Sequence, residues 1–395
     1  MRVLIASDTY YPHVNGASYF TQRLAHILAE AGHEVGVISP SQTIGHDDTM
    51  HGKVKHFGIR SFPIFIVPKF RFVVPGTFSA RVADVLRSFN PDVVHVQMHF
   101  AISRTTVKLA HKQDIPLVAT NHFMPENLTH YLHLPPSVTR KIHELAWKDA
   151  VRVYRKTYHV TAPTKTAAVM LEPWHKSQVS VISNGIDRKR FNPNNDPTAA
   201  REKYALPQKP ILLFVGRLDK EKNVDVVLRA VALARHKVDF HFVAAGHGAE
   251  RARLERLAKQ LGIEESVTFA GFVPDDLLPS LYAAADCFVN AGIAELQCIV
   301  AMEAMATGLP VLGAHAVALP ELIHHGENGY LFMPSDHTTL ATYIVTMLSS
   351  PHERARMGQK SLEIISNHDI SNTLEAFEHL YRKAIAKQID TLTTR

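Results

Sequence analysis

The chain has 395 residues, more than one domain core usually holds, so we expect two domains of ordinary size. Hydrophobic residues make up 46% and charged residues 20%, which is typical of a soluble globular protein with a large core. The two cysteines, Cys287 and Cys298, are too few for a disulfide framework or a zinc spacing, so we expect a reducing cytoplasm. Neither a signal peptide nor an apolar run of about 18 residues is found, so no membrane span is expected.

The net charge of +6 is carried by the first half of the chain. Residues 1–185 contain 20 lysines and arginines against 12 acidic residues, a net charge of +8, and the remainder has a net charge of −2. A basic half implies an anionic partner, such as nucleic acid, acidic lipid or a phosphorylated substrate. Because no nucleic-acid motif accompanies this charge, we expect no nucleic-acid partner.

Strand-like runs alternate with helix-like segments along almost the whole chain, which predicts a parallel α/β architecture. The first series has a helix at 19–31 and strands at residues 3–6, 34–38, 93–96, 116–120 and 159–162. A proline- and asparagine-rich stretch, Phe191–Thr198, has the composition of a linker. The second series has strands at residues 211–215, 240–244, 267–269, 287–289 and 310–312. The pattern predicts two doubly wound, Rossmann-like domains, residues 1–187 and residues 188–365.

Seven uncharged residues separate two glutamates, Glu295 and Glu303. The second glutamate opens a helix-like segment that ends at Gly308. One carboxylate is therefore expected at or before a helix start and the other about two turns along, roughly 12 Å away at about 1.5 Å per residue. Backbone N–H groups between them would suit a pyrophosphate or a sugar hydroxyl. The spacing alone equally suits a solvated helix with two surface acids.

Basic residues and glycine turns follow several predicted strands. Gly216, Arg217 and Lys222 come directly after the strand at 211–215, where α/β folds bind ligands. A guanidinium and an ammonium there could hold two phosphates, although such a pair is often only solvated. Gly246 and Gly248 form a second turn after a strand, which is weak evidence by itself. The first strand lacks a Gly-x-Gly-x-x-Gly sequence, so no dinucleotide site is expected there.

Together these motifs resemble glycosyltransferase family 4, whose retaining members carry a Glu-x7-Glu signature. The resemblance extends over nearly the whole chain and is nearest to the diacylglycerol and phosphatidylinositol glycosyltransferases. It implies two facing Rossmann-like domains of the GT-B type. The N-terminal, acceptor-side domain would be completed by a last helix, about 366–395, that crosses back to it. Residues 188–365 would then bind the nucleotide sugar.

The resemblance also implies a role for each matching residue on the donor side. Arg217 and Lys222 would stabilise the departing diphosphate, Glu295 would orient donor-sugar hydroxyls, and Glu303 would hold the ribose. Catalysis would thus involve His122, Arg217, Lys222 and Glu295. The remaining donor contacts would come from Gly16, Gly216, Gly246, Gly271, Phe272, Leu296, Gln297, Cys298 and Ile299.

Three residues of the first half match the acceptor side of the family. Asn15 and Gly16 lie in the loop His13–Ser18 after the first strand, where Ala17 replaces a second glycine. His122 ends another strand and matches a Thr-x-His motif at the sugar site. An ordinary surface or core histidine is the alternative interpretation of His122.

The chain departs from the common family pattern after the first glutamate. Many members read Glu-Gly-Phe-Gly, whereas this chain reads Glu-Leu-Gln-Cys over Glu295–Cys298. The Gln297 amide could hydrogen-bond a hydroxyl or phosphate, and the Glu-x-Gln form resembles diacylglycerol glucosyltransferases. No Asp-x-Asp motif ends a strand, and Asp275 with Asp276 reads as a helix N-cap pair. We therefore expect no metal and no cofactor, with the cations and helix N-termini stabilising the leaving group.

Two segments of the basic half could touch a membrane surface. Arg60–Val74 mixes bulky apolar residues with cations, which suits an interfacial segment or a half-buried strand. Ser137–His159 has a net charge of +4 and includes Trp147, Tyr154 and Tyr158, which also suits a solvated basic helix. We expect peripheral docking on anionic lipid at the inner face of the plasma membrane.

The sequence thus predicts a retaining hexosyltransferase that uses a nucleoside-diphosphate sugar, a UDP-sugar first and GDP-mannose second. The expected acceptor is a membrane glycolipid or a diacylglycerol-type lipid. Alternatives are a soluble sugar or polysaccharide acceptor, a nucleotide-sugar epimerase, and a non-catalytic nucleotide-sugar-binding protein.

Overall fold

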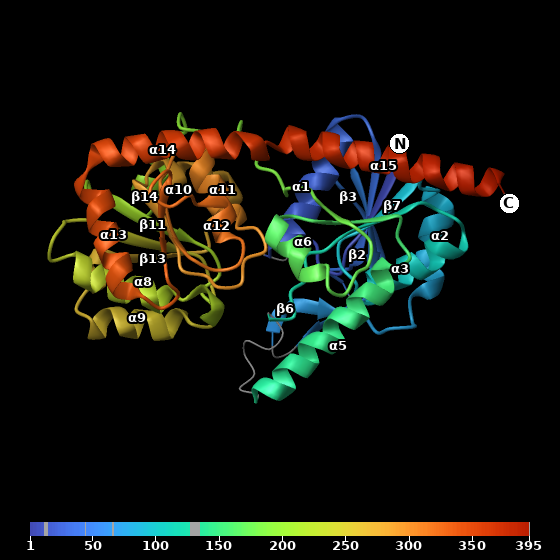
Figure 1. The fold of residues 1–395 in the computed structure, drawn as a ribbon, viewed down its shortest axis with the longest axis horizontal. Coiled ribbons are helices and arrows are strands. Elements are labelled where there is room, and N and C mark those ends of the chain that lie inside the picture. The colour runs from blue at the N-terminus through green and yellow to red at the C-terminus, as the bar shows by residue number, and fades with distance from the viewer. Residues whose placement is uncertain (12–14, 44, 65–66, 127–134, 395) are drawn as a thin grey trace. The chain divides into compact units, whose positions relative to one another are not determined.

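The structure, a computed structural model, describes residues 1–11, 15–43, 45–64, 67–126 and 135–394. It consists of two compact units (Figure 1). The N-terminal unit contains residues of the range 1–183 together with 373–394, and the C-terminal unit contains Asn184–Asn372. The first segment of the N-terminal unit ends at Ser183, four residues before the domain boundary that we expected after residue 187. The chain rejoins this unit at Thr373, whereas the sequence predicted about residue 366.

The N-terminal unit is built on an eight-stranded sheet in the order β10-β9-β8-β7-β1-β2-β4-β3. Only the edge pair β3–β4 is antiparallel within the described sheet. The strands are β1 (Arg2–Ala6), β2 (Glu34–Pro40), β3 (Asp47–His51), β4 (Val54–Ile59), β7 (Val93–Val96), β8 (Leu117–Thr120), β9 (His159–Ala162) and β10 (Val179–Val181). The helices are α1 (Gly16–Glu30), α2 (Ser79–Phe89), α3 (Ala101–Lys112), α5 (Pro136–Tyr154) and α6 (Lys165–Leu171). A separate antiparallel pair is formed by β5 (Phe62–Ile64) and β6 (Val67–Phe72).

The C-terminal unit has a six-stranded parallel sheet in the order β13-β12-β11-β14-β15-β16. Its strands are β11 (Ile211–Val215), β12 (His241–Ala245), β13 (Val267–Gly271), β14 (Cys287–Asn290), β15 (Val311–Ala314) and β16 (Gly329–Phe332). Its α-helices are α7 (Thr198–Lys203), α8 (Val224–Ala234), α9 (Arg251–Gln260), α10 (Leu278–Ala283), α11 (Ile299–Ala306), α12 (Leu319–Leu322), α13 (His337–Ser349) and α14 (Pro351–Ile365). The strand order reverses between β11 and β14, and doubly wound folds bind ligands at the carboxyl ends of the strands at such a point.

Burial explains why these strands could be predicted. Every residue of β11 and of Val3–Ala6 in β1 is buried, because helices cover each sheet on both faces (Figure 1). Parallel strands covered on both faces read as continuous apolar runs in the sequence. In the described part of the chain, no helix combines the length and the apolar character needed to cross a bilayer.

The last helix, α15 (Ile370–Thr393), completes the core of the N-terminal unit. Phe377 is fully buried and its ring lies 5.9 Å from that of Phe20 on α1. The hydroxyl of Tyr381 lies 2.8 Å from Nδ1 of His95 on β7. Figure 1 shows α15, in red, beside the blue elements of this unit. The prediction that the last helix returns to the first domain is therefore confirmed.

We expect Phe377→Ala to lower the free energy of unfolding of the N-terminal unit by about 3 kcal/mol, because it leaves a cavity in a packed core. Urea denaturation followed by tryptophan fluorescence measures this, since Trp147 and Trp174 both belong to that unit. Ile389→Ala on the same helix is the control, because Ile389 is 55% exposed and should cost less than about 0.5 kcal/mol. Equal effects of the two substitutions would contradict the packing of α15.

Candidate active site

Three glycines end adjacent strands of the C-terminal sheet and bring their turns close together. Gly246 N–H donates to the carbonyl of Gly271 at 2.7 Å, and Gly216 N–H donates to the carbonyl of Ala245 at 2.9 Å. A Cβ atom on Gly246, which has φ +143°, would lie 1.8 Å from the carbonyl oxygen of Gly216. A Cβ atom on Gly248 would lie 2.1 Å from the carbonyl oxygen of Leu218. Both positions therefore require glycine, and the predicted turns are close-packed backbone.

An ion pair joins the turns that follow β11 and β14. Lys222, which ends the short 3₁₀ helix η1 (Lys220–Lys222), places its Nζ 2.6 Å from Oε1 of Glu295. The two residues are 73 positions apart and meet because β11 and β14 are neighbours in the sheet. Each side chain is 15% exposed. Burial alone would lower the pKa of Lys222, but the Glu295 carboxylate outweighs it and raises that pKa above its ordinary value.

Arg217 lies in the same turn and is held by two carboxylates. Its guanidinium is paired with Asp219, and its second terminal nitrogen lies 2.6 Å from Oε1 of Glu221. Glu221 is nearly buried, whereas the Arg217 side chain is 39% exposed. The site thus presents a fixed guanidinium beside the Lys222 ammonium, which are the groups that bind phosphates.

The helix expected between the two glutamates is α11, which begins at Ile299 and stops before Gly308 at φ +82°. Glu295 precedes it, and Glu303 lies on its second turn. Glu303 is 3% exposed, and its Oε2 accepts a hydrogen bond from the hydroxyl of Tyr282 at 2.9 Å. Glu303 is consequently not the solvated surface acid of the alternative interpretation.

The residues between Glu295 and α11 are tied to the protein itself. The side-chain oxygen of Gln297 accepts the backbone N–H of Asn184 at 2.7 Å, and the contact expected between the Gln297 amide and a ligand stays a prediction. The sulfur of Cys298 accepts from the Asn290 amide at 2.9 Å. Burial raises the pKa of Cys298 well above its usual range, so it is a neutral thiol. Leu296 and Ile299 are partly exposed beside them.

Sequence reasoning missed Gly292, which packs between the partners of the ion pair. A Cβ atom there would lie 3.4 Å from Oε1 of Glu295 and 3.6 Å from Cδ of Lys222. It would also lie 2.8 Å from the side-chain oxygen of Asn290, which already accepts the Gly292 N–H at 2.7 Å. The available signal was a glycine two residues after a strand, close to the positions of Gly216 and Gly246.

His247 is a second residue that the sequence did not single out. Its Nε2 accepts the backbone N–H of Phe272 at 3.1 Å, and the two rings are stacked with an interplanar angle of 12°. Phe272 is 51% exposed, so a flat apolar ring faces solvent just after β13. A nucleoside base is the kind of group that stacks on such a ring.

In the N-terminal unit, His122 follows β8, as its sequence position predicted. Its Nε2 donates to the side-chain oxygen of Gln97 at 3.0 Å, and its ring lies 4.9 Å from that of Phe20. Burial lowers the pKa of His122 to about 3, so the imidazole is neutral. Gln97 was not predicted, and it fixes which His122 nitrogen carries the hydrogen.

Asn15 and Gly16 open α1, three residues before the predicted helix start. The Asn15 side chain caps the helix by accepting the N–H of Ser18 at 2.9 Å. A Cβ atom on Gly16 would meet nothing within 4 Å, so no packing within the described structure requires this glycine. His13 and Val14 of the same loop lie outside the described residues.

The described residues contain no group of three His, Cys, Asp or Glu side chains placed to hold a metal ion. The prediction that Asp275 and Asp276 form an N-cap pair is wrong. They lie inside the first turn of the short 3₁₀ helix η3 (Asp275–Leu277), whose N-cap position is occupied by Pro274.

Known proteins match this chain along almost its whole length. The model for glycosyl transferases group 1 matches residues 196–363, and that for glycosyltransferase family 4 matches residues 14–190. A D-inositol 3-phosphate glycosyltransferase 2 of Catenulispora acidiphila is 31% identical over 79% of this chain and 77% of that protein. A GDP-mannose-dependent alpha-mannosyltransferase of Corynebacterium glutamicum is 28% identical over 84% of this chain and 76% of that protein. An alpha-monoglucosyldiacylglycerol synthase of Acholeplasma laidlawii is 27% identical, covering 89% of each.

Solved structures agree with the fold. The sucrose-phosphate synthase of Thermosynechococcus elongatus aligns with a TM-score of 0.81 at 20% identity, covering 98% of this chain and 100% of that one. The predicted two-domain, Rossmann-like GT-B fold is thereby confirmed. These matches show that the chain belongs to glycosyltransferase family 4 and is a hexosyltransferase.

Proposed function

We propose that this hexosyltransferase moves a hexose from a nucleoside-diphosphate sugar to a membrane lipid acceptor with retention of the α configuration. The observation that carries the proposal is the ion pair of Lys222 and Glu295, beside Arg217, at the point where the strand order reverses. UDP-sugars are the favoured donors and GDP-mannose the second choice. A glucosyldiacylglycerol synthase and a GDP-mannose-dependent enzyme among the relatives support these two options.

The cations of the site suit the departure of a nucleoside diphosphate. The bond between C1 of the sugar and the phosphate oxygen breaks, and its electron pair stays on that oxygen. Arg217 and Lys222 would exchange carboxylate partners for phosphate oxygens and stabilise this charge. The acceptor hydroxyl attacks C1 from the face that the phosphate leaves, and its proton passes to the leaving phosphate. These fixed cations would supply the charge stabilisation, so we propose no metal or other cofactor.

The carboxylates and His122 are proposed to position the donor. Glu295, released from Lys222 by the diphosphate, would accept hydrogen bonds from sugar hydroxyls. Glu303, held by Tyr282, would bind the ribose hydroxyls. A neutral His122 can hydrogen-bond an uncharged sugar without adding a positive charge. Asn15 and Gly16 would border the acceptor, and the Gly16 turn has room for a close ligand.

We expect Lys222→Ala and Glu303→Ala each to lower kcat/KM by more than tenfold, because one charged contact is worth about 1.5–3 kcal/mol. Hexose transfer to diacylglycerol in mixed micelles, measured with UDP- and GDP-sugars, provides the readout. Lys220→Ala is the matched control, since Lys220 is exposed on the same short helix and should stay within about twofold of wild type.

The same assay separates the alternatives. Wild-type turnover in both the Lys222 and Glu303 variants would overturn the proposed site. Conversion of the donor in the absence of acceptor would identify an epimerase, and transfer to soluble glycans alone would remove the lipid acceptor. The proton spectrum of the product reports the anomeric configuration, and a β product would contradict retention.

We expect Gln297→Leu to lower the free energy of unfolding by about 1–3 kcal/mol, because the buried N–H of Asn184 loses its acceptor. Thermal denaturation of the variant checks this. Leu296→Ala, one position away on a partly exposed side chain, serves as the control. Unchanged stability combined with altered donor preference would instead place the Gln297 side chain in contact with the donor.

Peripheral membrane docking is proposed from one face of α5. Val138, Leu145, Lys141, Lys148 and Arg152 recur at helical spacing on that face and are all exposed. Apolar residues flanked by cations on one exposed stripe suit an anionic lipid surface.

Some residues of the two predicted membrane segments pack against the protein, whereas Phe72, Val74 and Tyr158 within them are exposed. Trp147 and Tyr154 are buried, so the aromatic contribution expected from them is wrong. Arg60–Val74 contains the paired strands β5 and β6, and its Arg71 guanidinium donates to Ser61 and Thr43. The proposal rests on the stripe of α5, because exposed apolar residues and cations share one face there.

We expect wild-type protein to sediment with vesicles containing anionic lipid more than with neutral vesicles. Lys141→Glu combined with Lys148→Glu should reduce that binding at least fivefold, because it reverses two charges on the stripe. Lys108→Glu combined with Lys112→Glu on α3 makes the same charge change elsewhere in the N-terminal unit and should have a smaller effect. Equal sedimentation with anionic and neutral vesicles would remove the proposal.

A further inference from the structure

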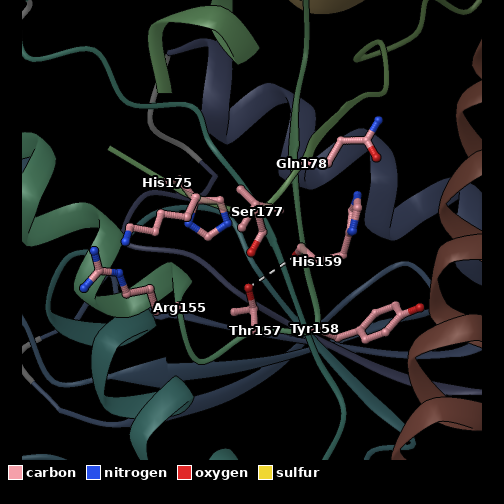
Figure 2. Close-up of a pocket in the computed structure, with 9 residues that line it drawn as sticks. Arg155, Thr157, Tyr158, His159, His175, Ser177 and Gln178 are labelled. Carbon is pink, nitrogen blue, oxygen red and sulfur yellow. Dashed lines mark hydrogen bonds between the residues drawn. The ribbon is translucent and has the colours of Figure 1, made fainter. Parts of the chain in front are cut away.

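A small basic pocket lies in the N-terminal unit between the end of α5 and the loop before β10 (Figure 2). Its volume is about 120 Å³, which is room for several water molecules and hence for a small oxyanion. Arg155 and Lys176 provide its cations, and Thr157 and Ser177 provide hydroxyls. Neither Arg155 nor Lys176 forms an ion pair with any described carboxylate.

The inner wall of the pocket contains a buried polar group that lacks a partner. His175 is 6% exposed, and its Nδ1 makes no hydrogen bond within the described structure. In Figure 2 its ring lies between Arg155 and Ser177. Burying an unpaired ring nitrogen is unfavourable, so a ligand that accepts or donates a hydrogen bond there would be stabilised.

Two cations, Arg155 and Lys176, line the pocket beside two imidazoles. Burial lowers the pKa of His175, and the charges of Arg155 and His159 lower it further. Burial also lowers the pKa of His159, and the positive charge of Lys383 on α15 lowers it further. Two cationic side chains together with imidazole and hydroxyl groups are suited to bind a tetrahedral oxyanion.

The pocket is distinct from the proposed transfer site. Thr157 and Tyr158 precede β9, and the N–H of Tyr158 donates to the carbonyl of Leu117 at the start of β8. His122 follows the opposite, carboxyl end of β8, and the strand from Leu117 to Thr120 alone spans about 10 Å at about 3.3 Å per residue. The pocket therefore lies at the amino end of β8, whereas His122 follows the carboxyl end of the same strand.

We propose that this pocket binds the phosphoryl group of a phosphate monoester. Arg155 and Lys176 hold two of its oxygens, and Ser177 and His175 donate to the others. The phosphate monoester is either a small soluble molecule or the headgroup of phosphatidic acid. This binding does not depend on the proposed transfer reaction.

Titration of the full-length protein with sodium phosphate at constant ionic strength tests the proposal. Trp174 adjoins His175 and is one of two tryptophans, so its fluorescence reports on the pocket. We expect a saturable change, with at least tenfold weaker affinity in the Arg155→Ala, Lys176→Ala double variant. Arg152→Ala, which removes a cation from the preceding turn of α5, should stay within about twofold. Binding at Arg217 and Lys222 is separated by repeating the titration in saturating UDP.

A second variant addresses the ring nitrogen. His175→Leu replaces an unpaired buried nitrogen by an apolar group and should fold, while weakening phosphate binding at least fivefold. Three results would each overturn the proposal. The first is a response to sodium phosphate no larger than the response to sodium chloride at the same ionic strength. The others are equal phosphate affinities in the double variant and Arg152→Ala, and wild-type phosphate affinity in His175→Leu.

The source of the phosphoryl group is identified by comparing glycerol 3-phosphate with phosphatidic acid in phosphatidylcholine vesicles. A headgroup ligand predicts that the double variant binds these vesicles at least fivefold more weakly than a Lys108→Ala, Lys112→Ala variant, which removes two cations of α3 outside the α5 stripe. A soluble ligand predicts that glycerol 3-phosphate competes with phosphate and that vesicle binding is unchanged by the double variant.

Discussion

The pair of Lys222 and Glu295 is the contact around which the C-terminal unit arranges its site. Two mostly buried charges are stable only together, because removing either leaves the other without compensation in a medium of low dielectric. The pair ties together the turns that follow the neighbouring strands β11 and β14, and a Cβ atom at position 292 between them would lie 2.8 Å from the side-chain oxygen of Asn290. The Glu295 charge also helps to hold the neighbouring Cys298 as a neutral thiol. Under the proposed function, a phosphate group that entered here would replace the Glu295 carboxylate as the partner of Lys222, so no new unpaired charge would be buried.

Much of the fold could be read from the sequence because its central strands are buried on both faces. The runs at 93–96, 159–162 and 211–215 coincide with β7, β9 and β11. The edge strand β3 was missed, because Asp47–His51 is largely exposed and polar and carries no apolar pattern. Its strand conformation comes from antiparallel pairing with β4, which is a tertiary effect that local sequence does not encode.

Site residues could be predicted where a recognisable motif follows the end of a strand. They could not be predicted where a residue's contact partner is distant in the sequence. Glycine turns and the glutamate spacing are local patterns, so Gly246 and Glu303 could be singled out. The partner of Gln297 is a backbone N–H 113 residues away, and no spacing rule points to it. In the same way, Trp147 and Tyr154 suggested a membrane face by composition, yet the rotation of α5 turns them into the core.

The return of α15 to the N-terminal unit has a consequence for how the protein is made. During synthesis the C-terminal unit, which is continuous in sequence, is complete as soon as Asn372 has left the ribosome. The unit translated first still lacks Phe377 and Tyr381, and its buried His95 still lacks a partner 286 residues downstream. The half that is begun first is thus the half that is finished last, and until then its uncovered apolar face is a surface for chaperones or for aggregation.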